Sequence, residues 1–562
     1  MVAGLIMLTA CSTGPGLDEP ADSGEEDSRP SAIEPDNPTP RQSPDRLQAR
    51  PEPRHEAADV AMLPTARVRE AARSHAAAPP MPQRLQQVVD RENYHAFDDN
   101  PVHRVAERPV STFSIDVDTG SYANVRRMLG QGRLPPTDAV RVEEMINYFD
   151  YDYPAPAAGQ APFSVTVEQA PTPWNPATRL LQIGIRGASP PTEAIPPANL
   201  VFLIDVSGSM NSADKLGLLR NGLKLLVGQL DAHDRVAMVV YAGTTAVVLE
   251  STPGDRHGTI NAAIDRLSAG GSTNGGAGIA LAYAQARQGF IEGGINRIVL
   301  ATDGDFNVGT VSFEALLDQV KRQRKSGIAL TTLGFGTGNY NDHLMEQLAD
   351  AGDGNHAYID TLNEARKVLV EEMHATLMTI ARDVKIQLEF NPAVVAEYRL
   401  IGYENRALRR EDFNNDAVDA GDIGAGHTVT ALYEIALTGS GGERVDVLRY
   451  GSRSRATTID GSSRELGFLR LRYKRPGDDS SRLIEQAIER QERDDTGYRI
   501  GFAAAVAAFG QYLRGGRYLE GYDLSAIHEL ASRSRGEDPS GYRGEFLQLL
   551  RLADSLSPAD RA

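Results

Sequence analysis

The chain has 562 residues, a formal net charge of −18 and 41% hydrophobic residues. A chain of this length exceeds what one hydrophobic core usually supports, so we expect several domains, and the apolar fraction is sufficient to build their cores. The negative charge argues against nucleic acid and against anionic membrane surfaces as the main partners. Partners with basic surfaces, or partners reached through a metal ion, are compatible with it.

The single cysteine of the chain, Cys11, follows a short apolar run that ends in Leu8, Thr9 and Ala10. This arrangement resembles a bacterial lipobox, in which small residues admit the signal peptidase and the thiol receives a lipid. We therefore expect a lipoprotein signal peptide over residues 1–11 and a lipid anchor on Cys11. The expected location is the bacterial cell envelope, facing the periplasm, with the outer membrane favoured because an Asp does not follow the cysteine. A chance cysteine in an apolar leader is the alternative, since no Lys or Arg precedes it.

Residues 12–108 are predicted to be a disordered tether. They hold 14 of the 32 prolines among acidic, Arg and Ala residues, without lasting hydrophobic periodicity. Such a composition buries too little apolar surface to offset the entropy lost on ordering, and Pro-rich chain is extended. No other stretch approaches the ~18 apolar residues of a membrane span, so lipid is the only expected membrane attachment.

An N-terminal module is expected over residues 109–196. Hydrophobic periodicity predicts a strand, two helices and two further strands, over residues 111–117, 122–129, 141–149, 163–169 and 179–186.

Strands and helices alternate between residues 197 and 375. Nearly continuous apolar strands, such as 200–205 and 297–302, are joined by amphipathic helices, such as 215–230, and the last helix is predicted over residues 362–379. Strands this apolar are typical of a mainly parallel sheet covered on both faces. We predict an α/β, doubly wound domain here.

A C-terminal module is expected over residues 376–562. Its first part has the alternation of strands, and residues 481–556 are predicted to be mostly helical. Because strand-like segments flank the α/β domain on both sides, we predict that this domain interrupts one β-sandwich built from both flanks. Two separate small β modules are the alternative. The acidic stretch 414–422 is expected to be a polar loop, with a weak Ca²⁺ site as the alternative.

Oxygen-bearing side chains follow the strands of the predicted parallel sheet. Asp205, Ser207 and Ser209 form a D-x-S-x-S sequence at the end of one strand, Thr273 opens a helix after a Gly-rich loop, and Asp303 ends a second buried strand. In an open parallel sheet these positions share the edge where ligands bind. Carboxylate and hydroxyl oxygens suit a hard cation such as Mg²⁺ or Mn²⁺. Turn and capping residues without a metal are the alternative.

This pattern of five residues resembles the metal-ion-dependent adhesion site of von Willebrand factor A domains, as in integrins. The resemblance implies that Ser207, Ser209 and Thr273 bind the metal directly, and that Asp205 and Asp303 bind it directly or through water. It leaves one coordination position for an acidic side chain of a partner. The expected function is therefore capture of an unknown protein through its exposed Asp or Glu, without catalysis.

Further segments extend this resemblance to roughly residues 100–560. Residues 111–127, 141–149, 301–309 and 501–514 are similar to the corresponding segments of bacterial YfbK-like A-domain lipoproteins. This similarity supports the division into modules but implies no defined activity.

Two other functions are alternatives to metal-dependent capture. The string from Phe113 to Thr119 resembles the D-x-D-x-T motif of haloacid-dehalogenase-type phosphatases, with Asp116 as nucleophile and Asp118 handling the proton in Mg²⁺-dependent hydrolysis. That chemistry requires its own α/β domain, whereas the sequence around it predicts antiparallel strands, so we expect Asp116 and Asp118 to be capping or turn residues. A passive structural envelope protein is the other alternative. His343 and His356 are expected at the surface.

Overall fold

The computed structural model describes residues 92–157, 161–189, 191, 195–272, 275–304, 312–338, 340–446, 464–478, 480–491 and 496–557. All of them belong to one unit, residues 85–562. The predictions on Cys11, on the tether up to residue 91 and on Thr273 lie outside the described residues.

The α/β domain is built on a sheet with the strand order β10-β9-β8-β5-β6-β7. The strands are parallel except β7, which forms an antiparallel hairpin with β6. Their bounds are β5 (Ala198–Asp205), β6 (Arg235–Tyr241), β7 (Thr245–Pro253), β8 (Ile295–Thr302), β9 (Ala329–Phe335) and β10 (His356–Ile359). The mainly parallel sheet confirms the predicted fold class.

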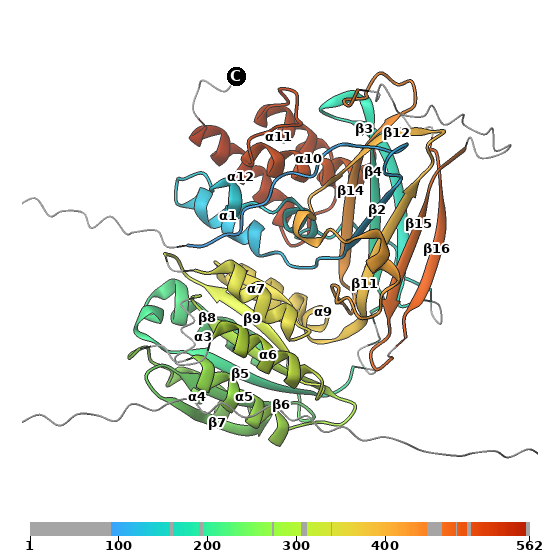
Figure 1. The fold of residues 1–562 in the computed structure, drawn as a ribbon. Helices are drawn as coiled ribbons and strands as arrows, with labels where there is room; N and C mark the ends of the chain where they lie inside the picture. Colours follow the sequence, from blue (N-terminus) through green and yellow to red (C-terminus); the bar gives the residue numbers. More distant parts are fainter. Residues whose placement is uncertain are drawn as a thin grey trace, which may run out of the picture. The chain divides into compact units, whose positions relative to one another are not determined.

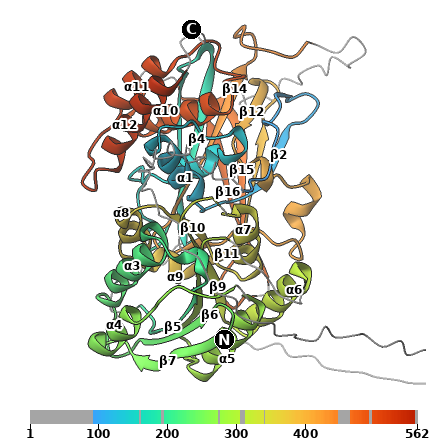
Figure 2. The ribbon, with the colours of Figure 1, turned by 90° about the vertical axis from the view of Figure 1, so that its left-hand side faces the viewer.

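Helices cover both faces of this sheet, because its strands are apolar on both sides. Along β5, Leu200, Phe202 and Ile204 belong to one hydrophobic cluster, and Val201 and Leu203 belong to another. The first cluster includes α3 and α4, and the second includes α5, α6 and α7; Figure 2 shows α3 and α4 on one side of the sheet and α6 on the other. These helices are α3 (Leu218–Val227), α4 (His257–Asp265), α5 (Gly275–Gln288), α6 (Phe313–Arg324) and α7 (Asp342–Ala351).

The β-sandwich contains strands from both sides of the α/β domain in the sequence (Figure 1). One sheet has the order β1 (His103–Arg104), β12 (Val395–Ile401), β14 (Thr428–Leu437), β4 (Asn175–Gly187) and β3 (Phe163–Thr172). The other has the order β13 (Ile423–Gly424), β11 (Thr379–Phe390), β15 (Glu465–Lys474) and β16 (Arg482–Glu489), with β2 (Val110–Ser114) paired to β11. Side chains from both sheets share one core. The prediction of a single sandwich built from both flanks is confirmed.

A helical region packs beside the sandwich and also combines both flanks. Its helices share one core and are α1 (Gly120–Gly130), α2 (Val142–Asn147), α10 (Tyr498–Leu513), α11 (Leu524–Arg533) and α12 (Tyr542–Leu556). In α10 the residues from Phe502 to Phe509 are fully buried. None of the helices in the described part of the chain has the length and apolar character needed to cross a bilayer.

Three sequence predictions were wrong in detail. Residues 92–108, predicted as tether, contact the folded body, and β1 pairs with β12 through backbone hydrogen bonds that composition does not reveal. β16 is a strand where a helix was predicted. The prediction failed because most side chains of β16 are exposed, so its sequence shows no clear strand-like apolar pattern. The helix predicted over residues 362–379 is instead α8 (Leu362–Arg366), a π-helical turn, α9 (Met373–Leu377) and the start of β11.

Candidate metal centre

Four of the five predicted metal ligands lie at one edge of the parallel sheet. Asp205 is the last residue of β5, and Ser207 and Ser209 belong to the turn that follows it. Asp303 comes directly after β8, which pairs with β5 in parallel. The carboxyl ends of neighbouring parallel strands meet at one edge, which is why the sequence places these side chains together.

The turn after β5 holds its oxygen atoms through local hydrogen bonds. The backbone N–H of Ser207 donates to Oδ1 of Asp205 at 2.8 Å, and the hydroxyl of Thr302 donates to Oδ2 at 3.0 Å. The hydroxyl oxygens of Ser207 and Ser209 are 2.9 Å apart. Asp205 is fully buried whereas Ser209 is exposed, so the group of oxygens extends from the sheet edge to the surface.

The loop that precedes Thr273 lies against this turn. The N–H of Gly208 donates to the carbonyl of Gly271 at 3.0 Å, and the N–H of Gly270 donates to the carbonyl of Val206 at 2.7 Å. Gly271 has a φ of +89°, a left-handed conformation that favours glycine. The backbone thus brings the segment before Thr273 to the D-x-S-x-S turn.

The site concentrates negative charge in a buried place. Burial raises the pKa of Asp205, and the nearby negative charge of Asp303 adds to this effect. Nζ of Lys215 lies 2.9 Å from Oδ2 of Asp303, and both side chains are buried. Sequence reasoning missed Lys215, because its position in the turn before α3 gives no signal that it reaches a residue 88 positions away.

The chemistry of these donors fits a divalent cation. Two carboxylates and two hydroxyl groups are hard oxygen ligands, and the ammonium group at Asp303 shows that the site accepts a positive charge. Within the described ranges, no three His, Cys, Asp or Glu side chains are grouped as for a metal, so this donor set depends on hydroxyl oxygens in addition to its carboxylates. In the alternative Ca²⁺ loop, Asp416 pairs with Arg472 and Asp419 pairs with Arg324, while Oδ1 of Asp422 accepts the N–H of Asp383.

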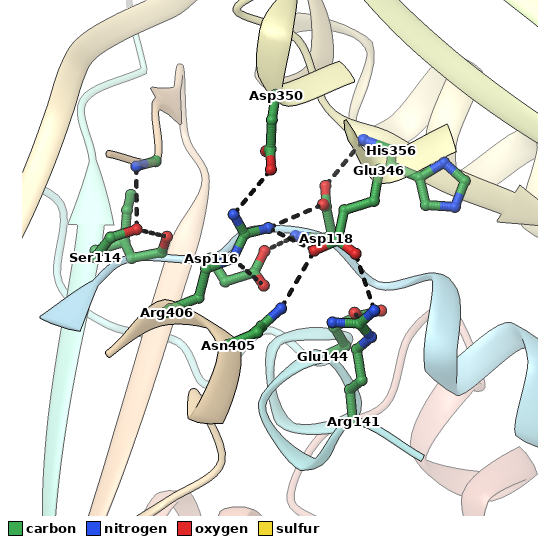
Figure 3. A network of polar contacts seen from close by, with 12 residues as sticks. Ser114, Asp116, Asp118, Arg141, Glu144, Glu346, Asp350, His356, Asn405 and Arg406 are labelled. Atoms are coloured by element: carbon green, nitrogen blue, oxygen red, sulfur yellow. Dashed lines mark hydrogen bonds and ion pairs between the residues drawn. The ribbon is translucent and has the colours of Figure 1, made fainter. Parts of the chain in front are cut away.

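Asp116 and Asp118, the residues of the phosphatase-like alternative, belong to a different network (Figure 3). Oδ1 of Asp116 accepts the N–H of Asp118 at 3.0 Å, as in the predicted turn, and Oδ2 accepts from Arg406 at 3.0 Å. Oδ1 of Asp118 accepts the N–H of His356 at 2.9 Å. Burial raises the pKa of Asp118 well above its usual value, and the charge of Asp116 adds to this effect.

This network joins the α/β domain to the rest of the unit. Arg406, which follows β12, contacts Asp116 and also Glu346 and Asp350 of α7 (Figure 3). β2, which precedes Asp116, is a strand of the antiparallel sandwich and not of an α/β domain. The position and partners of these carboxylates are those of structural ion pairs.

His356, predicted at the surface, is buried with 4% of its area exposed. Its Nδ1 lies 2.9 Å from the hydroxyl of Thr332, and its Nε2 lies 2.6 Å from the hydroxyl of Tyr340. β10 pairs with β9 and places His356 opposite Thr332, while Tyr340, after the end of β9, provides the partner of Nε2. The other histidine, His343, is partly exposed.

The doubly wound fold, with oxygen-bearing side chains grouped at one edge of its parallel sheet, defines a protein built around a von Willebrand factor A-type domain. Residues 199–372 match the family model of the von Willebrand factor type A domain. Residues 88–182 match a model described as von Willebrand factor, and residues 375–556 match one described as the C-terminal part of uncharacterized protein YfbK.

The chain belongs to the YfbK family of bacterial A-domain proteins. Uncharacterized protein YfbK of Escherichia coli (strain K12) is 51% identical to it over 474 residues, 83% of this chain and 81% of that protein. Human inter-alpha-trypsin inhibitor heavy chain H3 is 25% identical over 263 residues, 43% of this chain and 29% of that protein. A solved structure, von Willebrand factor type A from Catenulispora acidiphila, is 16% identical with a TM-score of 0.38, covering 70% of this chain and 91% of its own.

Proposed function

We propose that the A domain binds Mg²⁺ or Mn²⁺ and captures another protein through an Asp or Glu of that partner. The observation that carries this proposal is the gathering of Asp205, Ser207, Ser209 and Asp303 at one edge of the parallel sheet. Thr273, which follows a loop hydrogen-bonded to the same turn, is the proposed fifth ligand.

The bound cation would supply a positive charge that attracts the partner's carboxylate. The chain's own residues hold the site in place: Ser207 and Thr302 fix both oxygens of Asp205, and the exposed Ser209 gives a partner access to the site. A carboxylate is the natural hard oxygen ligand for such an ion, and the surrounding surface would supply specificity. No observation favours hydrolysis, because Asp116 and Asp118 both contact Arg406.

We also propose that the protein is a lipoprotein anchored through Cys11, facing the periplasm, with the outer membrane favoured. The support is the lipobox-like sequence and the Pro-rich segment after it. Fractionation of cells that produce Cys11→Ser tests this, because the variant should move from the membrane fraction to the soluble fraction. An unchanged distribution would contradict the anchor.

The binding proposal is tested with Ser207→Ala/Ser209→Ala beside the wild type and a control, Ser212→Ala. Ser212 lies in the same segment, but its hydroxyl donates to Asp214 and not to the site. Metal-stripped wild type and control should show a higher melting temperature on titration with Mg²⁺, since a ligand that binds only the folded state stabilises it. The double variant should show a much smaller rise.

The same three proteins then serve as baits in pull-downs from envelope extracts, with Mg²⁺ and with EDTA. A partner should be retained by wild type and control only with Mg²⁺, and substitution of its contacting Asp or Glu should abolish retention. Identical melting shifts in all three proteins, or identical sets of retained proteins in every condition, would contradict the proposal. The second result would favour a passive structural role.

A further inference from the structure

Lys215 places a positive charge inside the candidate metal centre. Its Nζ is 2.9 Å from Oδ2 of Asp303, and only a tenth of its side-chain area is exposed, 10% against 0% for Asp303. Lysine is rarely buried unless its charge is paired, so this pair is a built feature of the site and not a chance surface contact.

The backbone on both sides of the lysine is adapted to bring it there. Lys215 lies in a π-helical turn, Ala213–Gly217, that precedes α3, and its own φ of −117° and ψ of −106° are not helical. A regular helix over residues 215–230, as the sequence predicts, would not contain this turn.

The end of β9 provides the space for the lysine side chain. Gly336, directly after β9, has a φ of +74°, and a Cβ atom at this position would lie 2.2 Å from Cε of Lys215. A side chain at residue 336 would therefore block the path of the lysine toward Asp303. The turn before α3 positions the lysine, and the glycine after β9 leaves room for its side chain beside Asp303.

We propose that Lys215 is a tethered counter-ion that occupies Asp303 in the metal-free protein and competes with the divalent cation for it. This inference rests on the proposed metal site. The ammonium group and a divalent cation would require the same carboxylate, and two positive charges so close in a buried site repel each other. Cation binding is therefore coupled to the departure of Lys215 from Asp303 and to a rearrangement of the turn Ala213–Gly217.

The physical consequence is that the negative charge of the site is partly neutralised without metal. Two buried carboxylates, Asp205 and Asp303, would otherwise repel each other when metal is absent. The lysine stabilises the metal-free protein and lowers its affinity for metal. The position of the turn Ala213–Gly217, near the edge where a partner would bind, then depends on the local concentration of the divalent cation.

The test measures Mn²⁺ affinity by electron paramagnetic resonance and melting temperature in EDTA. Lys215→Met removes the ammonium group and keeps much of the side-chain length; Lys215→Gln is a second neutral variant in case the first does not fold. Lys224→Met is the matched control, because Lys224 lies on α3 and pairs with Asp265 at the surface. Asp205→Ala, which removes one proposed ligand, shows how much of the measured Mn²⁺ binding occurs at the proposed metal site.

We expect the neutral variants to bind Mn²⁺ tighter by about tenfold or more, since one competing charge is removed, and to melt at a lower temperature than wild type in EDTA. Lys224→Met should match wild type in both measurements. In wild type, hydrogen exchange of the amides of residues 213–217 should become faster when Mn²⁺ binds.

Two different failures are distinguishable. If wild type binds Mn²⁺ in a manner lost in Asp205→Ala, but Lys215→Met and Lys215→Gln bind it equally or more weakly, the counter-ion role is wrong and the proposed metal site stands. If no protein binds Mn²⁺ above the level of Asp205→Ala, both proposals are wrong.

Discussion

Glu143 of α2 is a carboxyl group with 1% of its area exposed, and its Oε2 has no hydrogen-bond partner among the described residues. Burial raises its pKa to about 7, and the negative charges of Glu404 and Asp116 add to this rise. The folded protein therefore holds a proton on Glu143 that the unfolded chain has already lost. Between the ordinary carboxyl pKa and about 7, stability must fall as the pH rises, because the folded state binds more protons than the unfolded state.

We predict that Glu143→Gln removes this loss. At pH 5 the variant and wild type should have similar stability, and at pH 8 the variant should be more stable by on the order of 3 kcal/mol. Urea unfolding at the two pH values measures the difference. Glu537→Gln, at an exposed position, is the control and should follow wild type at both. A constant difference between Glu143→Gln and wild type would show that ionisation of Glu143 is not involved.

At the scale of elements, β11 links the α/β domain to the sandwich. One residue separates it from α9, and its central residues pair with β2 on one side and β15 on the other. Earlier in the chain, the connection from β4 to β5 also joins the sandwich to the α/β domain. Two short connections therefore attach the A domain to strands inside the sandwich.

Edge and interior elements differ in how clearly the sequence predicts them. β14 is buried on both faces, and its β-branched and apolar residues with strand-like alternation predict a strand. β16 is an edge strand with mostly exposed side chains, and its mixture of charged and apolar residues is equally consistent with a helix. Its pairing with β15 decides between the two, through backbone hydrogen bonds.

At the scale of the whole unit, buried ion pairs hold the A domain to the other modules. Arg126 of α1 contacts Glu364 at 2.7 Å and also Asp360, both in the A domain, and Arg406 contacts Glu346 at 3.0 Å. The A domain has hydrophobic clusters of its own, separate from those of the sandwich and the helical region. Loss of one of these arginine side chains should therefore weaken the contact between the A domain and the other modules more than it weakens the hydrophobic core of either part.

We predict that Arg406→Ala destabilises the protein by about 3–5 kcal/mol, because Asp116 and Glu346 lose the cation that neutralises them in a buried place. The A domain should then unfold separately, giving two transitions in calorimetry where wild type gives one. Lys224→Ala is the control, because Lys224 forms an exposed pair with Asp265 inside the A domain, and it should melt like wild type. A single, unshifted transition in Arg406→Ala would contradict this role for Arg406.

The sequence by itself determined the elements and chemistry that arise from local patterns. Apolar strands alternating with amphipathic helices specify the doubly wound domain, and the D-x-S-x-S turn with Asp303 follows from residues at strand ends, which share one edge in any parallel sheet. Strand-like alternation on both flanks predicted one sandwich but left two separate β modules open, and the core shared by strands of both flanks decides for one sandwich.

Only the tertiary structure decided which distant charges meet. Arg406 and Asp116 are 290 residues apart, and Lys215 and Asp303 are 88 apart, so no local periodicity records either pair. A buried ion pair depends on the exact placement of two side chains by separate elements, whereas a strand or a helix depends mainly on the spacing of its own apolar residues. For this reason the sequence predicts the ligand set of the site, and the structure alone reveals the lysine within it.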